Sequence, residues 1–375
     1  MEKLFGQIEL ISGVLSRSNL VSSEKITNSG SSGGDGFEGG RFLAMLMVVY
    51  GHWLQYAGRY SLPGLTPGEI AKILHYLYSV HIQVFFFIAG FVYYKYSKPI
   101  GGFGKYRSFL AGKALRLLVP FLSVSLVQFA VKYFLGGGEP RQLAVMLFAP
   151  RGGPAAHLWF LYVLFAIFAI AGSAELLRGA KKPIALFACS LALACLPIGF
   201  PSYKEFGLLD LQSLVWFMQF FLAGSVLAEK GLNFPALNRY WFFALLAFGV
   251  WGLSRPESFS GYPSAEQGVF NRIFQFAVTL AGIAAVIRFG SFVKGVLSRF
   301  VAGISGLSYD IYLLHVIIAH GMFTVFVRLK PGLAASLVWV TLGPALCIGT
   351  AILIAGALRA YAPLRMVFLG LPYRR

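Results

Sequence analysis

Histidine side chains inside strongly apolar segments are the groups of this chain best suited to chemistry. His52, His81 and His315 each lie well within such a segment. An imidazole accepts or donates a proton near neutral pH, so it suits general acid–base catalysis. Ionisable groups are costly inside a bilayer and usually functional there, although a single membrane histidine also suits a hydrogen bond between helices. These three residues are therefore candidate site residues.

Spacing places further polar groups beside two of these histidines. Arg41 precedes His52 by eleven residues. That separation is about three helical turns, so both side chains share one helix face, about 16 Å apart along the axis. Ser308, Tyr312 and His315 share a face by the same periodicity. Arg41 alone also suits an anchor at the membrane interface, but its spacing from His52 favours a joint role.

The remaining histidines carry simpler expectations. His75 and His157 lie near the outer ends of apolar segments and are expected to face water, whereas His320 is expected in the core. The chain has no HExxH, no clustered carboxylate pair and no CxxC, so the sequence predicts no metal site.

A basic, glycine-rich segment is the second candidate site. It contains Lys95, Lys98, Lys105, Arg107, Lys113 and Arg116. Such charges are typical of a cytoplasmic loop, and they also suit an anionic ligand such as the phosphates of a nucleotide cofactor. A P-loop and a supported GxGxxG motif are both missing, so a soluble-type nucleotide fold is not indicated.

The composition shows what kind of scaffold must position these groups. Of 375 residues, 57% are hydrophobic and 12% charged, whereas soluble domains carry about 25% charged residues. The mean hydropathy is +0.71. A soluble enzyme, a coiled coil and a disordered protein are excluded. The net charge of +18 fits membrane loops beside anionic lipid rather than nucleic-acid binding.

Cys189, Cys195 and Cys347 are expected to be small buried hydrophobes without disulfides.

Apolar runs of membrane-spanning length recur along the chain and predict an all-α polytopic bundle of about ten transmembrane helices. The predicted spans are 41–58, 73–95, 115–135, 156–174, 183–200, 212–229, 239–254, 269–288, 303–327 and 334–358. The longest connection, 136–155, is a glycine- and proline-rich loop. Residues 1–40 are expected to form a flexible cytoplasmic tail, and 41–375 the transmembrane domain.

Charge placement predicts the orientation of the bundle. With both termini inside, 22 of the 32 Lys and Arg residues fall in cytoplasmic segments, as the positive-inside rule requires. In this orientation His52, His81 and His315 all lie near the middle of the membrane.

Several of these motifs together resemble the acyltransferase 3 family of integral membrane O-acyltransferases. Arg41 to His52 is similar to the family's R-x10-H signature, and the segment from His81 to Phe91 resembles its second-span pattern. The other matches are Lys113–Pro120 (KALRLLVP), His157–Leu161 (HLWFL) and Ser308–His315 (SYDIYLLH). Before Arg41, Glu38 and a glycine pair replace the aspartate of the family pattern.

The resemblance implies transfer of an acyl group, usually acetyl, from cytoplasmic acyl-CoA to a hydroxyl of an extracytoplasmic polysaccharide or glycoconjugate. It also implies a multi-pass protein of the bacterial inner membrane. The implied partners are acyl-CoA, a carbohydrate or glycolipid acceptor and membrane lipids, without nucleic acid or a metal.

On this basis each candidate residue has an expected role. His52 is the general base or a transient acyl acceptor, with the two roles left open. Arg41 holds a CoA phosphate or orders the cytoplasmic mouth. Lys113, Arg116 and Tyr309 are expected to bind the cofactor. Trp159, Tyr162 and His81 are expected to bind the substrate. Tyr309, Tyr312 and His315 are expected to donate hydrogen bonds to the thioester oxygen or to orient His52.

A structural role and other function classes complete the expectations. Asp310 is expected to pair with Arg41 or Arg116. Trp159 also suits an interfacial aromatic belt.

A transporter or flippase of a sugar-linked or small-molecule substrate is the alternative function, although no clear internal repeat supports it. A receptor or scaffold leaves the Arg41–His52 spacing unexplained.

Overall fold

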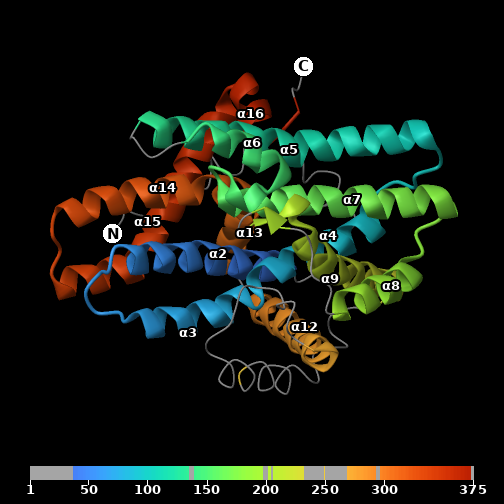
Figure 1. The fold of residues 1–375 in the computed structure, drawn as a ribbon, viewed down its shortest axis with the longest axis horizontal. Helices are drawn as coiled ribbons and strands as arrows, with labels where there is room; N and C mark the ends of the chain where they lie inside the picture. Colours follow the sequence, from blue (N-terminus) through green and yellow to red (C-terminus); the bar gives the residue numbers. More distant parts are fainter. Residues whose placement is uncertain are drawn as a thin grey trace.

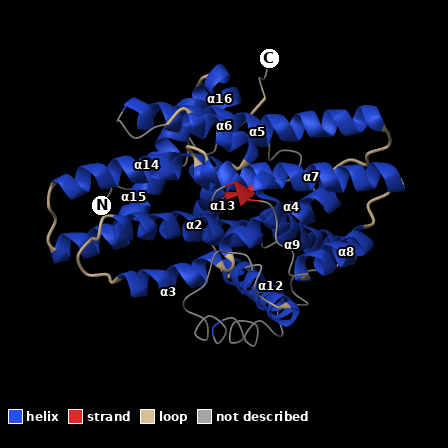
Figure 2. Cartoon of the chain, in the orientation of Figure 1, coloured by secondary structure: helices blue, strands red, loops and turns tan. Residues whose placement is uncertain are grey.

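The computed structural model describes residues 37–134, 139–196, 202–203, 206–231, 249, 268–292 and 296–372. Within these ranges the chain is helical apart from connections and one antiparallel pair of two-residue strands, β1 (Ser202–Tyr203) and β2 (Phe206–Gly207) (Figures 1 and 2). The helices are α2 (Phe37–Arg59), α3 (Pro67–Tyr78), α4 (His81–Tyr96), α5 (Phe103–Phe134), α6 (Arg141–Phe148), η1 (Pro150–Gly152), η2 (Ala156–Leu158), α7 (Trp159–Arg178), α8 (Pro183–Cys195), η3 (Leu208–Asp210), α9 (Leu211–Glu229), α12 (Val269–Ser291), α13 (Val296–Gly306), α14 (Ser308–Arg328), α15 (Leu333–Ala360) and α16 (Ala362–Leu369).

Seven helical segments in the described ranges are long and apolar enough to cross a membrane. They are Pro67–Tyr96, Phe103–Phe134, Ala156–Arg178, Leu208–Glu229, Val269–Ser291, Ser308–Arg328 and Leu333–Ala360. The prediction of an all-α polytopic bundle is confirmed. α2, with 23 residues, covers the first predicted span but is not among these seven segments.

Several boundaries differ from the prediction. α5 begins at Phe103 rather than near 115, because the basic segment continues the helix in register. α8 ends at Cys195, before the predicted end of its span. The ninth span divides at Leu307 into α13 and α14. The predicted span 239–254 lies outside the described residues apart from Gly249.

The start of α2 also differs from the predicted tail. Residues 1–36 lie outside the described part of the chain, but 37–40 form the first turn of α2. A Cβ atom added at Gly39 would meet the backbone of Gly290 at 2.1 Å. The glycine pair before Arg41 therefore lets α2 cross α12 with their backbones in contact.

A similar close crossing joins α4 and α9 at the core of the bundle. A Cβ atom on Gly90 would lie 1.7 Å from the carbonyl oxygen of Phe221, and one on Gly224 would lie 2.0 Å from that of Phe87. The Ser225 hydroxyl also donates to the Gly90 carbonyl at 2.9 Å. Small residues bring membrane helices together because lipid supplies no hydrophobic drive for association.

The other helices build around these crossings. α5 and α7 run side by side in Figure 1, with α16 packed on α5 and with α14 and α15 neighbouring one another. The Trp53 indole of α2 donates to the Trp339 carbonyl of α15 at 3.1 Å. α2 thus contacts helices from both halves of the sequence, and its side chains lie at the centre of the bundle.

Candidate functional site

Three imidazoles from distant parts of the chain meet inside the bundle. They belong to His52 in α2, His157 in η2 and His315 in α14. The ring centroids lie 5.1 Å apart for His52 and His315, 5.6 Å for His157 and His315, and 6.1 Å for His52 and His157. His157 is 8% exposed and His315 fully buried, whereas His52 is partly exposed. We call these three residues the histidine cluster.

Hydrogen bonds fix the protonation pattern of two members of the cluster. His315 Nδ1 lies 2.8 Å from the Tyr312 carbonyl oxygen, and His52 Nδ1 lies 3.0 Å from the Gln55 amide oxygen. Each oxygen only accepts, so each Nδ1 carries a proton and donates. The neutral rings therefore present an Nε2 lone pair, the atom that a general base needs.

His81 adjoins the histidine cluster through one aromatic ring. The Tyr78 ring lies 4.9 Å from His81 and 6.5 Å from His52. His81 Nδ1 donates to the Leu77 carbonyl at 2.6 Å. The structure thus brings all three histidines expected at mid-depth into one neighbourhood.

The expectation that His157 faces water is wrong. The predicted loop 136–155 contains α6 and η1, and η2 begins the predicted span 156–174. The chain from Ala149 to Leu158 is folded into the bundle. Lys132 Nζ donates to the Pro154 carbonyl at 2.7 Å, and the Tyr312 hydroxyl donates to the His157 carbonyl. Irregular backbone at membrane depth is tolerated where protein surrounds it and satisfies its polar groups. Hydropathy does not predict that such an irregular segment is buried. The HLWFL pattern of His157–Leu161 was the one feature of the sequence that pointed to it.

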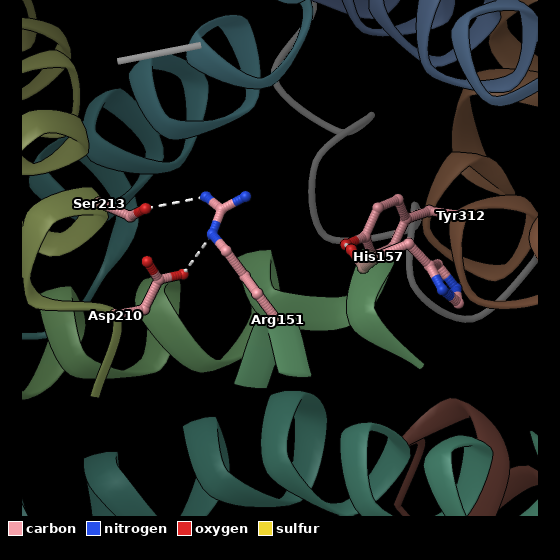
Figure 3. Close-up of polar contacts among 5 residues, drawn as sticks. All are labelled: Arg151, His157, Asp210, Ser213 and Tyr312. Atoms are coloured by element: carbon pink, nitrogen blue, oxygen red, sulfur yellow. Dashed lines mark hydrogen bonds and ion pairs between the residues drawn. The ribbon is translucent and has the colours of Figure 1, made fainter. Parts of the chain in front are cut away.

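Arg151 anchors the same segment to the start of α9. Its Nε donates to Asp210 Oδ2 at 3.0 Å and its Nη2 to Ser213 Oγ at 2.8 Å. Figure 3 shows this group on one side of the segment, with His157 and Tyr312 on the other. The Arg151 guanidinium also lies 3.8 Å from the Trp159 ring centroid, so it holds both ends of the segment.

The two aromatic residues predicted to contact substrate lie at the start of α7. Trp159 lies between Arg151 and Phe217, whose ring centroid is 5.1 Å away. Tyr162 packs 6.0 Å from Phe121. Both residues pack within the bundle against neighbouring helices, and a carbohydrate-binding role for them stays a prediction.

A cavity of about 520 Å³ contains the residues predicted to bind a cofactor. We call it the basic cavity, because Arg41, Lys113 and Arg116 all line it. Its walls combine the first turns of α2 and α14, the end of α13, one side of α4 along its length, and parts of α5 and α7. The remaining lining residues are Ile82, Phe85, Ile88, Ala89, Val92, Tyr93, Tyr96, Ser97, Phe160, Leu164, Phe168, Ser305, Gly306, Ser308, Tyr309 and Tyr312.

Two cations of the basic cavity contact neighbouring groups of the protein, whereas one nitrogen of the third has no hydrogen-bond partner among the described residues. Arg116 lies 4.0 Å from the Tyr309 ring centroid and donates to the Leu369 carbonyl. Lys113 Nζ lies 3.8 Å from the Phe168 ring centroid. Arg41 Nε is buried and has no hydrogen-bond partner among the described residues. Guanidinium and ammonium groups at an apolar wall suit a ligand that joins phosphates to an apolar arm.

Tyr312 connects the basic cavity to the histidine cluster. Tyr312 lines the cavity, and its ring centroid lies 5.9 Å from His315 and 6.1 Å from His157. The hydroxyl protons of both predicted tyrosines are directed to backbone oxygens. Tyr312 donates to the His157 carbonyl and Tyr309 to the Arg116 carbonyl, so in this conformation neither proton points to a bound thioester.

Asp310 pairs with a residue other than the two expected. Arg359 of α15 donates to Asp310 Oδ2 through Nε at 2.7 Å, and its Nη2 lies 2.6 Å from the same oxygen. The expected pairing with Arg41 or Arg116 is therefore wrong. Arg359 lies far along the sequence in a long apolar helix, and no local pattern identifies it as the partner.

The cysteines also depart from the prediction in one case. Cys195 and Cys347 are buried, but Cys189 is exposed on α8; all three are free thiols. Within the described ranges, no group of three or more His, Cys, Asp or Glu side chains is arranged to hold a metal ion.

Comparison with known proteins adds one match. A family model described as an acyltransferase domain matches residues 35–358, which is nearly the whole chain. The match includes every member of the histidine cluster and every residue that lines the basic cavity. No curated protein matches the chain, and no solved structure matches it.

Proposed function

Because the chain belongs to the acyltransferase 3 family and is a multi-pass membrane acyltransferase, we propose that it acts on carbohydrate. In this proposal it transfers an acyl group, acetyl in the simplest case, from acyl-CoA to a hydroxyl of an extracytoplasmic polysaccharide or glycoconjugate. The observation that carries the proposal is that Tyr312, which lines the basic cavity, has its ring 5.9 Å from His315 and 6.1 Å from His157 in the cluster of three imidazoles.

The donor is assigned from the chemistry of the basic cavity. Arg41, Lys113 and Arg116 supply positive charge for phosphates, and Phe85, Phe160 and Phe168 supply an apolar wall for a pantetheine arm and acyl group. Acyl-CoA combines these features. Positive-inside topology places the same cations on the cytoplasmic side, where acyl-CoA is made.

The histidine cluster supports the chemical step. His52 Nε2, with its tautomer fixed by Gln55, takes the proton of the acceptor hydroxyl as the oxygen attacks the thioester carbonyl. The new C–O bond forms, the C–S bond breaks and the thiolate is finally protonated. His315, fully buried beside His52, stabilises the protonated His52 ring by accepting a hydrogen bond at its Nε2.

The acceptor is proposed to approach from the opposite end of the bundle, where α2 and α14 finish. This arrangement lets the enzyme modify a glycan outside the cell with a donor made inside it. The proposal places the protein in the inner membrane of a bacterium, in agreement with its charge bias.

Radiolabelled donor tests the proposal directly. Inverted membrane vesicles that contain the full chain and the native glycans are incubated with [¹⁴C-acetyl]-CoA. Base-labile label is then measured in the glycan fraction. We expect ester-linked label that depends on the chain. A transporter or flippase consumes no thioester, so vesicles that move glycan without releasing free CoA would overturn the proposal in favour of that alternative.

A further inference from the structure

His157 is the member of the histidine cluster to which the proposed function gives no role. Its ring lies within about 6 Å of both other imidazoles, at 6.1 Å from His52 and 5.6 Å from His315. Its Nε2 is buried and has no hydrogen-bond partner among the residues that the structure describes. An unpaired buried nitrogen is costly, so its position indicates a function.

The chain is built to hold His157 at this place. Side chains from α5 and α14 and from the start of α9 all bind the segment that carries it. Lys132 binds the Pro154 carbonyl, Tyr312 binds the His157 carbonyl, and Arg151 is fixed by Asp210 and Ser213. Together they fix a short irregular segment so that one imidazole enters the cluster.

The neighbouring rings make proton exchange with His157 possible. His52 and His315 each use Nδ1–H on an oxygen of their own helix, so Nε2 is the atom of each ring that gains or loses a proton. His315 Nε2 is buried without a partner in the described residues, as His157 Nε2 is. A proton taken up by one ring is therefore close to further imidazole acceptors.

His157 also adjoins two residues of the basic cavity. Tyr312 lines that cavity, and its hydroxyl is bonded to the His157 carbonyl. Phe160, three residues along the chain, lines the same cavity. The wall of the basic cavity therefore lies next to His157, so a thioester bound against Tyr312 and Phe160 would be near its ring.

We propose that His157 is a further catalytic residue, which carries the proton from His52 to the departing sulfur. The inference rests on the proposed acyl transfer. His52 Nε2 takes the proton from the acceptor hydroxyl as the C–O bond forms and the C–S bond breaks. His157 Nε2 receives that proton and donates it to the thiolate sulfur. Every imidazole is neutral again at the end of the cycle, and the products are an ester and a free thiol.

A matched pair of histidine variants tests this role. In the vesicle assay with [¹⁴C-acetyl]-CoA, His157→Gln is expected to lower turnover roughly 10²- to 10⁴-fold, the usual contribution of a general acid or base. Its KM for acetyl-CoA should stay within about twofold, because the proton transfer occurs after binding. His320→Gln removes an imidazole outside the cluster, next to Tyr56, and should leave turnover unchanged.

The outcome separates this inference from the proposed function. If wild-type vesicles transfer label and His157→Gln transfers it at a similar rate, the role of His157 is overturned while acyl transfer stands. If wild-type vesicles transfer no label from acetyl-CoA, the acyl transfer itself fails.

A measurement on the wild-type chain covers the case in which His157→Gln does not fold. The transfer rate is measured in mixtures of H₂O and D₂O. The relay requires that the transfer to His52 and the transfer from His157 to the sulfur both contribute to the observed rate, and two contributing protons predict a rate that falls along a curve as the deuterium fraction rises. A straight line, which indicates a single transferred proton, would overturn the relay.

Discussion

The imidazole rings of His52 and His315 lie 5.1 Å apart, although α2 and α14 are far apart in the sequence. Each ring donates from Nδ1 to an oxygen of its own helix. The two helices therefore deliver two bases of the same tautomer to one place in the membrane.

Lys113→Ala is expected to weaken donor binding. Its ammonium group borders the basic cavity, and loss of one charged hydrogen bond to a phosphate costs about 1.5–3 kcal/mol, or roughly 10- to 100-fold in affinity. Lys105→Ala removes an exposed lysine of the same helix and serves as the control. Titration of acetyl-CoA should show a higher KM for Lys113→Ala alone; an equal rise in both variants would contradict a specific contact.

Gly224→Ala is expected to disrupt the crossing of α4 and α9. The added methyl group would lie 2.0 Å from the Phe87 carbonyl oxygen, and such overpacking costs about 1–3 kcal/mol or more. Gly349 in α15 has nothing within 4 Å of an added Cβ atom, so Gly349→Ala should be neutral or slightly stabilising. Thermal unfolding in nanodiscs compares them, and equal melting temperatures would refute the close crossing.

Asp310→Ala is expected to destabilise the bundle, because it leaves Arg359 charged and unpaired beside a buried site. Breaking a buried pair in this way costs about 3–5 kcal/mol. The double variant Asp310→Leu/Arg359→Met should recover most of that loss, because it removes both charges. Thermal unfolding of the single and double variants gives the answer, and additive losses would show that the pair does not couple.

Periodicity was enough to predict the parts of the site that lie on regular helices. The spacing of Arg41 and His52 and the shared face of Ser308, Tyr312 and His315 depend only on helical geometry. The structure places Arg41, Ser308 and Tyr312 on the basic cavity and both histidines in the cluster. Apolar run length likewise predicted most of the helices.

Sequence patterns could not predict the contacts between segments that lie far apart in the chain. His157 was missed as a site residue because it lies at the outer end of the predicted span 156–174, where a side chain is expected to face water, and periodicity does not predict how the irregular segment before it folds. The partner of Asp310 was missed because Arg359 lies on another helix, and helical periodicity relates residues within one helix only. The early start of α5 was missed because its first three turns are basic, which the run-length criterion treats as loop.

The imidazole of His52 is the group on which the account depends, and His52→Ala tests it most directly. The variant is reconstituted beside wild type, its insertion and thermal unfolding are matched, and the rate of acetyl transfer from [¹⁴C-acetyl]-CoA to membrane glycan is measured. We predict that ester-linked label falls to background while the protein stays folded. Transfer at a rate near that of wild type would contradict the assignment of the histidine cluster as the catalytic centre.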